Sequence, residues 1–197
     1  MTVLLVLLLT ALFHSDTEIG QRVFPVLLKE NLKLTSFDIS KSYRLNDNEF
    51  ILIGKNRKQT SENEGHRLLY LSRDSLEKSF TIKYLSKPKG EAYVYNPYFF
   101  KLNDELVIVA EEGFEFMSGI DIYRLRNEKV DFLGYVPVSG DERNSIVDQM
   151  KIKKEANNYS ISFEGRIEYE AGTDNLIDRK ILKVIIDQGG LKINKGN

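Results

Sequence analysis

Beyond residue 40, the hydrophobic and polar positions alternate with the period of β-strands. Runs of four to seven apolar or β-branched residues are bounded by Asn, Asp, Gly and Lys, a pattern typical of short strands joined by turns. Few segments keep a period of 3.6 residues over more than two turns. The segment 139–150 (SGDERNSIVDQM) is a candidate short helix, the alternative being a loop with one helical turn. The pattern predicts an all-β fold.

Three stretches repeat the same order of elements, namely strand, tight turn, strand, loop and two further strands. Their opening hairpins span residues 42–53, 98–109 and 149–163. The matched positions Phe50, Leu106 and Tyr159 lie 56 and 53 residues apart, within the range of blade-type repeats. Asparagine occupies each hairpin turn and tolerates a positive φ. The repeat predicts units at about 42–90, 91–138 and 145–195.

This order of elements resembles the four-stranded blades of β-propellers. Tyr98–Val136 is similar to a blade of the glycoside-hydrolase-like propellers, with Asn96-Pro97 before the hairpin and a strand ending at Leu133-Gly134. The resemblance implies an antiparallel meander of about three four-stranded units with a propeller-like arrangement. Closed propellers need at least four blades, and residues 22–39 could supply half a blade. The alternatives are a β-sandwich of about twelve strands and a fragment completed by another chain.

The N-terminus carries a short apolar segment. Residues 3–13 form a run of 11 residues interrupted only by Thr10, whereas a stable membrane span needs about 20. The run fits the apolar core of a secretory signal at 1–17, with cleavage before Glu18, although no Lys or Arg precedes it. We therefore expect export of a single domain, residues 18–197, to the periplasm or outside the cell. The alternative is a buried N-terminal strand.

Composition excludes several classes of function. The chain has 28 Lys and Arg and 29 Asp and Glu, and loss of a leader containing Asp16 would make the balance zero. This argues against nucleic acid as a partner, while neutrality permits a homo-oligomer. The absence of cysteine rules out disulfides and thiolate chemistry. With only His14 and His66, we expect no metal and no cofactor, and we interpret His66 as an exposed loop residue.

Carboxylates are the remaining candidates for chemistry, because nucleotide-binding and nucleophile motifs are missing. Glu111 and Glu112 end the apolar run VIVAEE; Glu164 follows YSISF, with Arg166 close behind. Two carboxylates about 5 to 9 Å apart would suit glycoside hydrolysis. The propeller glycosidases place their acids near strand starts around a central channel, but no acid here maps onto a defined motif position, so none is assigned as catalytic. The alternative is solvated strand-end residues.

Aromatic residues gather near these acids. Tyr93 and Tyr95 are expected on one face of a strand, and Phe114 and Phe116 on one face of the loop GFEFMSG. Aromatics beside carboxylates stack on sugars or anchor protein partners, although the same residues could pack against a neighbouring unit. The candidate ligand-binding residues are Tyr93, Tyr95, Glu111, Glu112, Phe114, Phe116, Glu164 and Arg166.

These observations predict an exported, non-catalytic β-repeat module that binds a protein or a glycan. An inhibitor or immunity protein that blocks a toxic enzyme is one concrete version. The alternatives are a partial or degenerate glycosidase-like propeller that uses carboxylate chemistry, and a structural subunit completed by a partner or a second copy.

Overall fold

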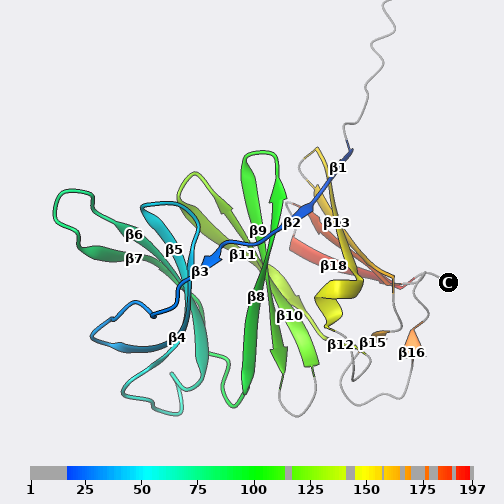
Figure 1. Ribbon diagram of the computed structural model, residues 1–197. Helices are drawn as coiled ribbons and strands as arrows, with labels where there is room; N and C mark the ends of the chain where they lie inside the picture. Colours follow the sequence, from blue (N-terminus) through cyan, green and yellow to red (C-terminus); the bar gives the residue numbers. More distant parts are fainter. Residues whose placement is uncertain are drawn as a thin grey trace, which may run out of the picture.

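The protein is all-β, as the alternation of hydrophobic positions predicts. A computed structural model describes residues 17–113, 117–140, 145–156, 158–164, 167–169, 176–177, 182–187 and 190–195. Three five-stranded antiparallel sheets lie side by side (Figure 1). A separate three-stranded sheet lies next to the third of them. Within the candidate helix at 139–150, the described residues form only a four-residue 3-10 helix, η1 (Ile146–Gln149). The apolar run 3–13 lies outside the described residues.

The first sheet is a four-stranded meander with one added strand. Its two middle strands carry the segments Phe50–Ile53 and Leu68–Leu71, which are buried on both faces. The first turn closes without a positive φ, since the Asn46 side-chain oxygen accepts a hydrogen bond from the Asn48 amide at 2.9 Å. In spatial order the strands are β3 (Val26–Leu27), β4 (Phe37–Arg44), β5 (Glu49–Asn56), β6 (His66–Arg73) and β7 (Phe80–Leu85).

The second sheet has the same organisation and lies in the middle of the molecule. Its first turn places Asn103 at φ 46°, and its last turn places Asn127 at φ 49° and Glu128 at φ 57°, the geometry that tight hairpins require. In spatial order the strands are β2 (Gln21–Val23), β8 (Val94–Leu102), β9 (Glu105–Gly113), β10 (Met117–Arg126) and β11 (Lys129–Val136).

The third sheet repeats the meander with a long excursion in its centre. The excursion adds β15 (Ile167–Tyr169) and β16 (Leu176–Ile177) to β12 (Val138–Gly140), which forms the small three-stranded sheet. In spatial order the strands of the main sheet are β1 (Thr17–Ile19), β13 (Met150–Glu155), β14 (Asn158–Phe163), β17 (Leu182–Asp187) and β18 (Gly190–Lys195).

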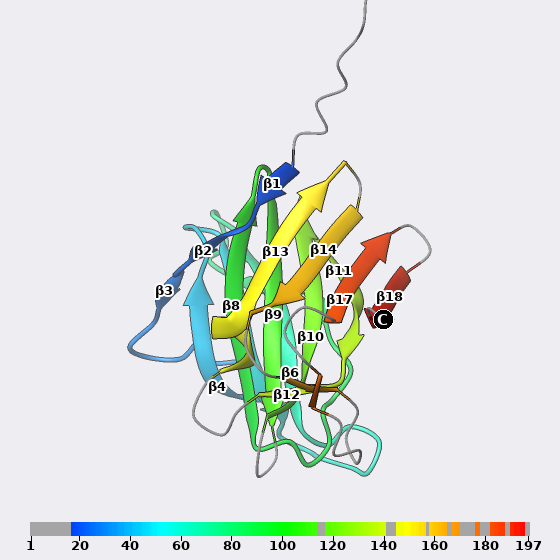
Figure 2. The same ribbon diagram turned by 90° about the vertical axis from the view of Figure 1, so that its right-hand side faces the viewer.

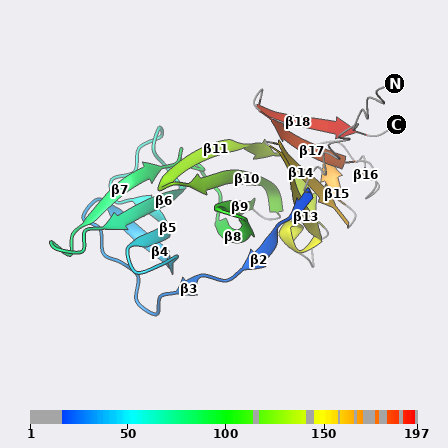
Figure 3. The ribbon, with the colours of Figure 1, turned by 90° about the horizontal axis from the view of Figure 1, so that it is seen from above.

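Residues 17–27, which we call the strap, cross all three sheets. The strap carries β1, β2 and β3, and each pairs with the first strand of a different meander (Figures 2 and 3). Unpaired strand edges invite association with other chains, so the strap protects three edges at once. The half blade expected from residues 22–39 is therefore not formed, because these residues are divided between the first two sheets.

The core has three apolar clusters: one on the outer face of the first sheet, and one on each side of the second sheet. The cluster between the first and second sheets includes Ile51, Tyr70 and Ile108. The cluster between the second and third sheets includes Val109, Ile122 and a large set from β13, β14 and β17. Burial of these side chains provides most of the stabilisation. In the part of the chain that is described, no helix is long and apolar enough to span a bilayer.

Candidate functional site

The consecutive acids Glu111 and Glu112 point to opposite faces of the second sheet, because neighbouring residues of a strand alternate. Glu111 is 1% exposed and accepts hydrogen bonds from the Ile146 amide at 2.6 Å, the Ser145 hydroxyl at 2.9 Å and the Tyr98 hydroxyl at 3.1 Å. It thereby anchors the start of η1. The two glutamates do not share a common site.

Glu112 belongs to a buried ionic cluster between the first two sheets. Lys89, on the connection from β7 to β8, lies 3.1 Å from Glu112 and 2.6 Å from Asp121, measured from its amine to their carboxylate oxygens. Asp121 also accepts hydrogen bonds from the hydroxyls of Tyr95 at 2.7 Å and Tyr123 at 2.9 Å. Burial raises the pKa of Tyr95 well above its usual range, helped by Tyr123 and Asp121. Tyr95 is therefore a protonated donor inside the core.

The other sequence candidates are spread over the molecule. Tyr93 precedes β8 and is 73% exposed, so it does not share a strand face with the buried Tyr95 as expected. Glu164 is exposed; its carboxylate pairs with Lys151 and its amide donates to the Gln149 carbonyl at 2.6 Å. Phe114, Phe116 and Arg166 lie outside the described residues. The candidates that are described do not converge on one cavity.

A fourth buried acid joins the second sheet to the third. Glu105 is fully buried and lies 3.2 Å from Arg126 and 3.0 Å from Lys154. It also accepts a hydrogen bond from the Tyr159 hydroxyl. Removing one partner of such a cluster leaves an uncompensated buried charge, so Glu105 serves the packing of the sheets.

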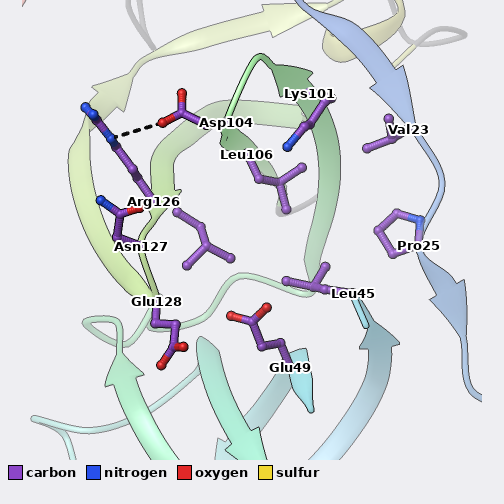
Figure 4. A pocket seen from close by; sticks show the side chains of 11 residues that line it. Val23, Pro25, Leu45, Glu49, Lys101, Asp104, Leu106, Arg126, Asn127 and Glu128 are labelled. Carbon is purple, nitrogen blue, oxygen red and sulfur yellow. Dashed lines mark ion pairs between the residues drawn. The ribbon is translucent and has the colours of Figure 1, made fainter. Parts of the chain in front are cut away.

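One accessible cavity lies at the hairpin-turn end of the first two sheets, beside the strap (Figure 4). Its volume is about 480 Å³, within the range of ligand pockets, roughly 300–1,000 Å³. The turns β4–β5, β8–β9 and β10–β11 contribute to it. Its lining residues are Val23, Pro25, Leu45, Glu49, Lys101, Asp104, Leu106, Leu125, Arg126, Asn127 and Glu128.

The charges in this turn-end pocket are segregated. Figure 4 shows Glu49 and Glu128 together at one end, and Lys101 with the Arg126–Asp104 pair at the other, with leucines between them. The Arg126 side-chain nitrogen lies 3.6 Å from the Asp104 carboxylate. The Glu49 carboxylate accepts hydrogen bonds from the neutral groups of Asn46 and Tyr70. The pocket thus combines an apolar centre with oppositely charged ends, which suits recognition of a ligand with polar groups.

Glu128 occupies an unusual backbone position for its residue type. It is the second central residue of the β10–β11 turn, with φ 57°, where such turns normally use glycine. A positive φ on a residue other than Gly or Asn stores strain that often accompanies function. The sequence predicts Asn127-Glu128 as a hairpin turn, and the structure confirms the turn. Sequence reasoning gave this turn no part in a site, and it missed Glu49, Lys101 and Arg126.

His66 is not the exposed loop residue that the sequence suggested. It is the first residue of β6, is half-buried, and has its ring Nδ1 3.0 Å from the Ala92 carbonyl. The pKa of His66 is lowered, mainly by burial and also by the positive charges of Lys55 and Lys41. The hydrogen bond to the Ala92 carbonyl acts in the opposite direction and raises it. Among the described residues, no group of three or more His, Asp or Glu side chains is arranged to hold a metal ion.

Comparison of the chain with models of known protein families, with curated proteins and with solved structures found no match in any of the three.

Proposed function

We propose that this chain is a non-catalytic β-repeat binding module and that the turn-end pocket is its ligand site. The observation that carries the proposal is the convergence of charged side chains from three hairpin turns around an apolar centre. Hairpin turns held on rigid strands are a common place for recognition. The ligand is a protein or a glycan. In one concrete version of this proposal, the chain is an inhibitor or immunity protein that binds and blocks a toxic enzyme.

The arrangement of the buried acids supports binding over hydrolysis. Glu105, Glu111 and Asp121 are at most 1% exposed, and each accepts hydrogen bonds or ion pairs from fixed partners. A glycosidase needs one carboxyl group that can give up its proton and a second that can reach the sugar. Glu112, the most accessible of the four at 9%, shares Lys89 with Asp121. The burial and the fixed partners of these four acids favour a structural role for them.

We further propose that the three main sheets correspond to three propeller-like blades. In support, each is a four-stranded meander whose first strand pairs with the strap. A two-layer sandwich would bury one face of each sheet, whereas the middle sheet here buries both. We also keep export as a proposal, based on the apolar run 3–13.

The test fills the pocket and asks whether binding is lost. Lys101→Trp places a large side chain in the cavity from an exposed position at the end of β8, and Lys83→Trp makes the same change at an exposed position on β7 as a control. Both variants and the unmodified protein are screened against arrays of glycans and short peptides. For any ligand that binds, we expect at least tenfold weaker affinity in Lys101→Trp and no change in Lys83→Trp.

Two results would overturn the proposal. One is binding that Lys101→Trp leaves unchanged, which would place the ligand elsewhere, for example near the exposed Tyr93. The other is hydrolysis of an arrayed glycan that disappears in Glu112→Gln, which would favour the glycosidase-like alternative.

A further inference from the structure

The acidic end of the turn-end pocket lacks a cationic partner. The Glu49 carboxylate, on β5, accepts side-chain hydrogen bonds from the neutral Asn46 and Tyr70, and no ion pair is formed by Glu49 or Glu128 among the described residues. Of the four buried acids, Glu105, Glu112 and Asp121 each have a lysine partner, whereas Glu111 has neutral donors. Two neighbouring carboxylates without a cation repel one another, so an incoming cation would relieve this repulsion.

The surroundings of Tyr70 agree with this description. Its hydroxyl donates to Glu49, and burial, that hydrogen bond, and the charges of Glu49 and Glu128 all raise the pKa of Tyr70. Both carboxylates therefore act on the same fully buried phenol, and the phenol stays neutral.

The other end of the pocket is largely neutralised by its own residues. Arg126 is engaged by Glu105 at 3.2 Å and Asp104 at 3.6 Å, which leaves Lys101 as the one cation lining the pocket with no recorded ion pair among the described residues. Leu45 and Leu106 lie between Lys101 and the two glutamates (Figure 4). A ligand that suits the acidic end should therefore carry its positive charge at the tip of an apolar stem.

We propose that the pocket receives the side chain of an arginine presented by a protein partner, with its guanidinium group between Glu49 and Glu128 and its methylene stem against the leucines. The proposal rests on the proposed function and names its ligand class. A planar guanidinium offers five N–H donors and can serve two carboxylates at once, whereas an ammonium group acts as a point charge. Arginine is also among the residues most enriched at the energetic centres of protein interfaces.

The test uses acetylated and amidated pentapeptides of sequence Gly-Gly-Xaa-Gly-Gly, titrated by isothermal calorimetry and by chemical-shift changes. Xaa is arginine, citrulline, lysine or glutamate; citrulline keeps the shape of arginine and lacks its charge. We expect the arginine peptide to bind at least tenfold more tightly than the citrulline peptide, with lysine intermediate and glutamate showing no binding. Affinity should fall as salt rises, since the pocket is open to solvent.

Matched variants test whether the arginine peptide binds at Glu49 and Glu128. Glu49→Gln and Glu128→Gln remove one charge each with little change in shape and should each weaken the arginine peptide about tenfold. Glu62→Gln makes the same change on an exposed loop and should leave binding unchanged. Thermal unfolding of each variant checks that the fold is retained, and the Glu62→Gln protein serves as the reference.

The outcomes separate this inference from the proposed function. Equal binding of arginine and citrulline peptides, or no loss in Glu128→Gln and Glu49→Gln, overturns the arginine assignment. If another arrayed peptide or a glycan then binds and Lys101→Trp blocks it, the pocket remains the ligand site and only the ligand class changes. If Lys101→Trp blocks nothing, both proposals fail.

Discussion

Glu128 connects backbone strain with the chemistry of the turn-end pocket. Its φ of 57° is a conformation that glycine adopts freely and glutamate adopts at a cost. The same turn places its side chain at the end of the pocket where Glu49 also lies (Figure 4), so that two negative charges share this end. The sequence thus retains at one position a residue that is unfavourable for stability on two counts, which is expected where a side chain serves binding.

The first stability prediction concerns this residue. Glu128→Gly should stabilise the fold by about 1 kcal/mol, because it removes the strained φ and one of the two negative charges at this end of the pocket. Glu128→Gln removes the negative charge but keeps a side chain at the strained φ, so it measures the effect of the charge alone. Chemical denaturation of the three proteins measures the difference. A Glu128→Gly protein that is less stable than the unmodified chain would show that the turn is not strained.

At the scale of elements, the hairpins could be predicted from the sequence and the strap could not. Asn103 and Asn127 mark turns with positive φ, and the alternation around them is regular. The strap forms strands of three, three and two residues, which are too short to show any period. Tyr93 was misplaced for a related reason: the strand begins one residue later, at Val94. The pocket required three turns from two sheets, and only the folded chain brings them together.

The second stability prediction concerns the strap. A chain that begins at Leu28 lacks β1, β2 and β3 and exposes the first strands of all three meanders. We expect a lower denaturation midpoint and self-association through the freed edges, seen as a larger mass by light scattering than that of a chain beginning at Thr17. An unchanged mass together with an unchanged midpoint would show that the strap contributes little.

At the scale of the whole molecule, buried acids at the sheet interfaces accompany the apolar core. Asp121 and Lys89 link the first and second sheets, and Glu105 with Lys154 links the second and third. The outer face of the first sheet is covered by Leu28, Leu32 and Leu34, whereas the third sheet presents exposed lysines on β13, β17 and β18. The stack therefore ends in a covered face and a polar face, as in repeat folds.

We propose that the ligand binds at the hairpin-turn end of the first two sheets and that the protein leaves it chemically unchanged. The most direct measurement is a map of backbone amide shifts in the unmodified protein as the arginine pentapeptide, or whichever arrayed ligand binds, is added. We predict saturable changes confined to residues 45–49, 101–106 and 125–128, with the ligand recovered intact. Changes centred instead on Lys89, Tyr93 and Glu112, or a cleaved ligand, would contradict the account.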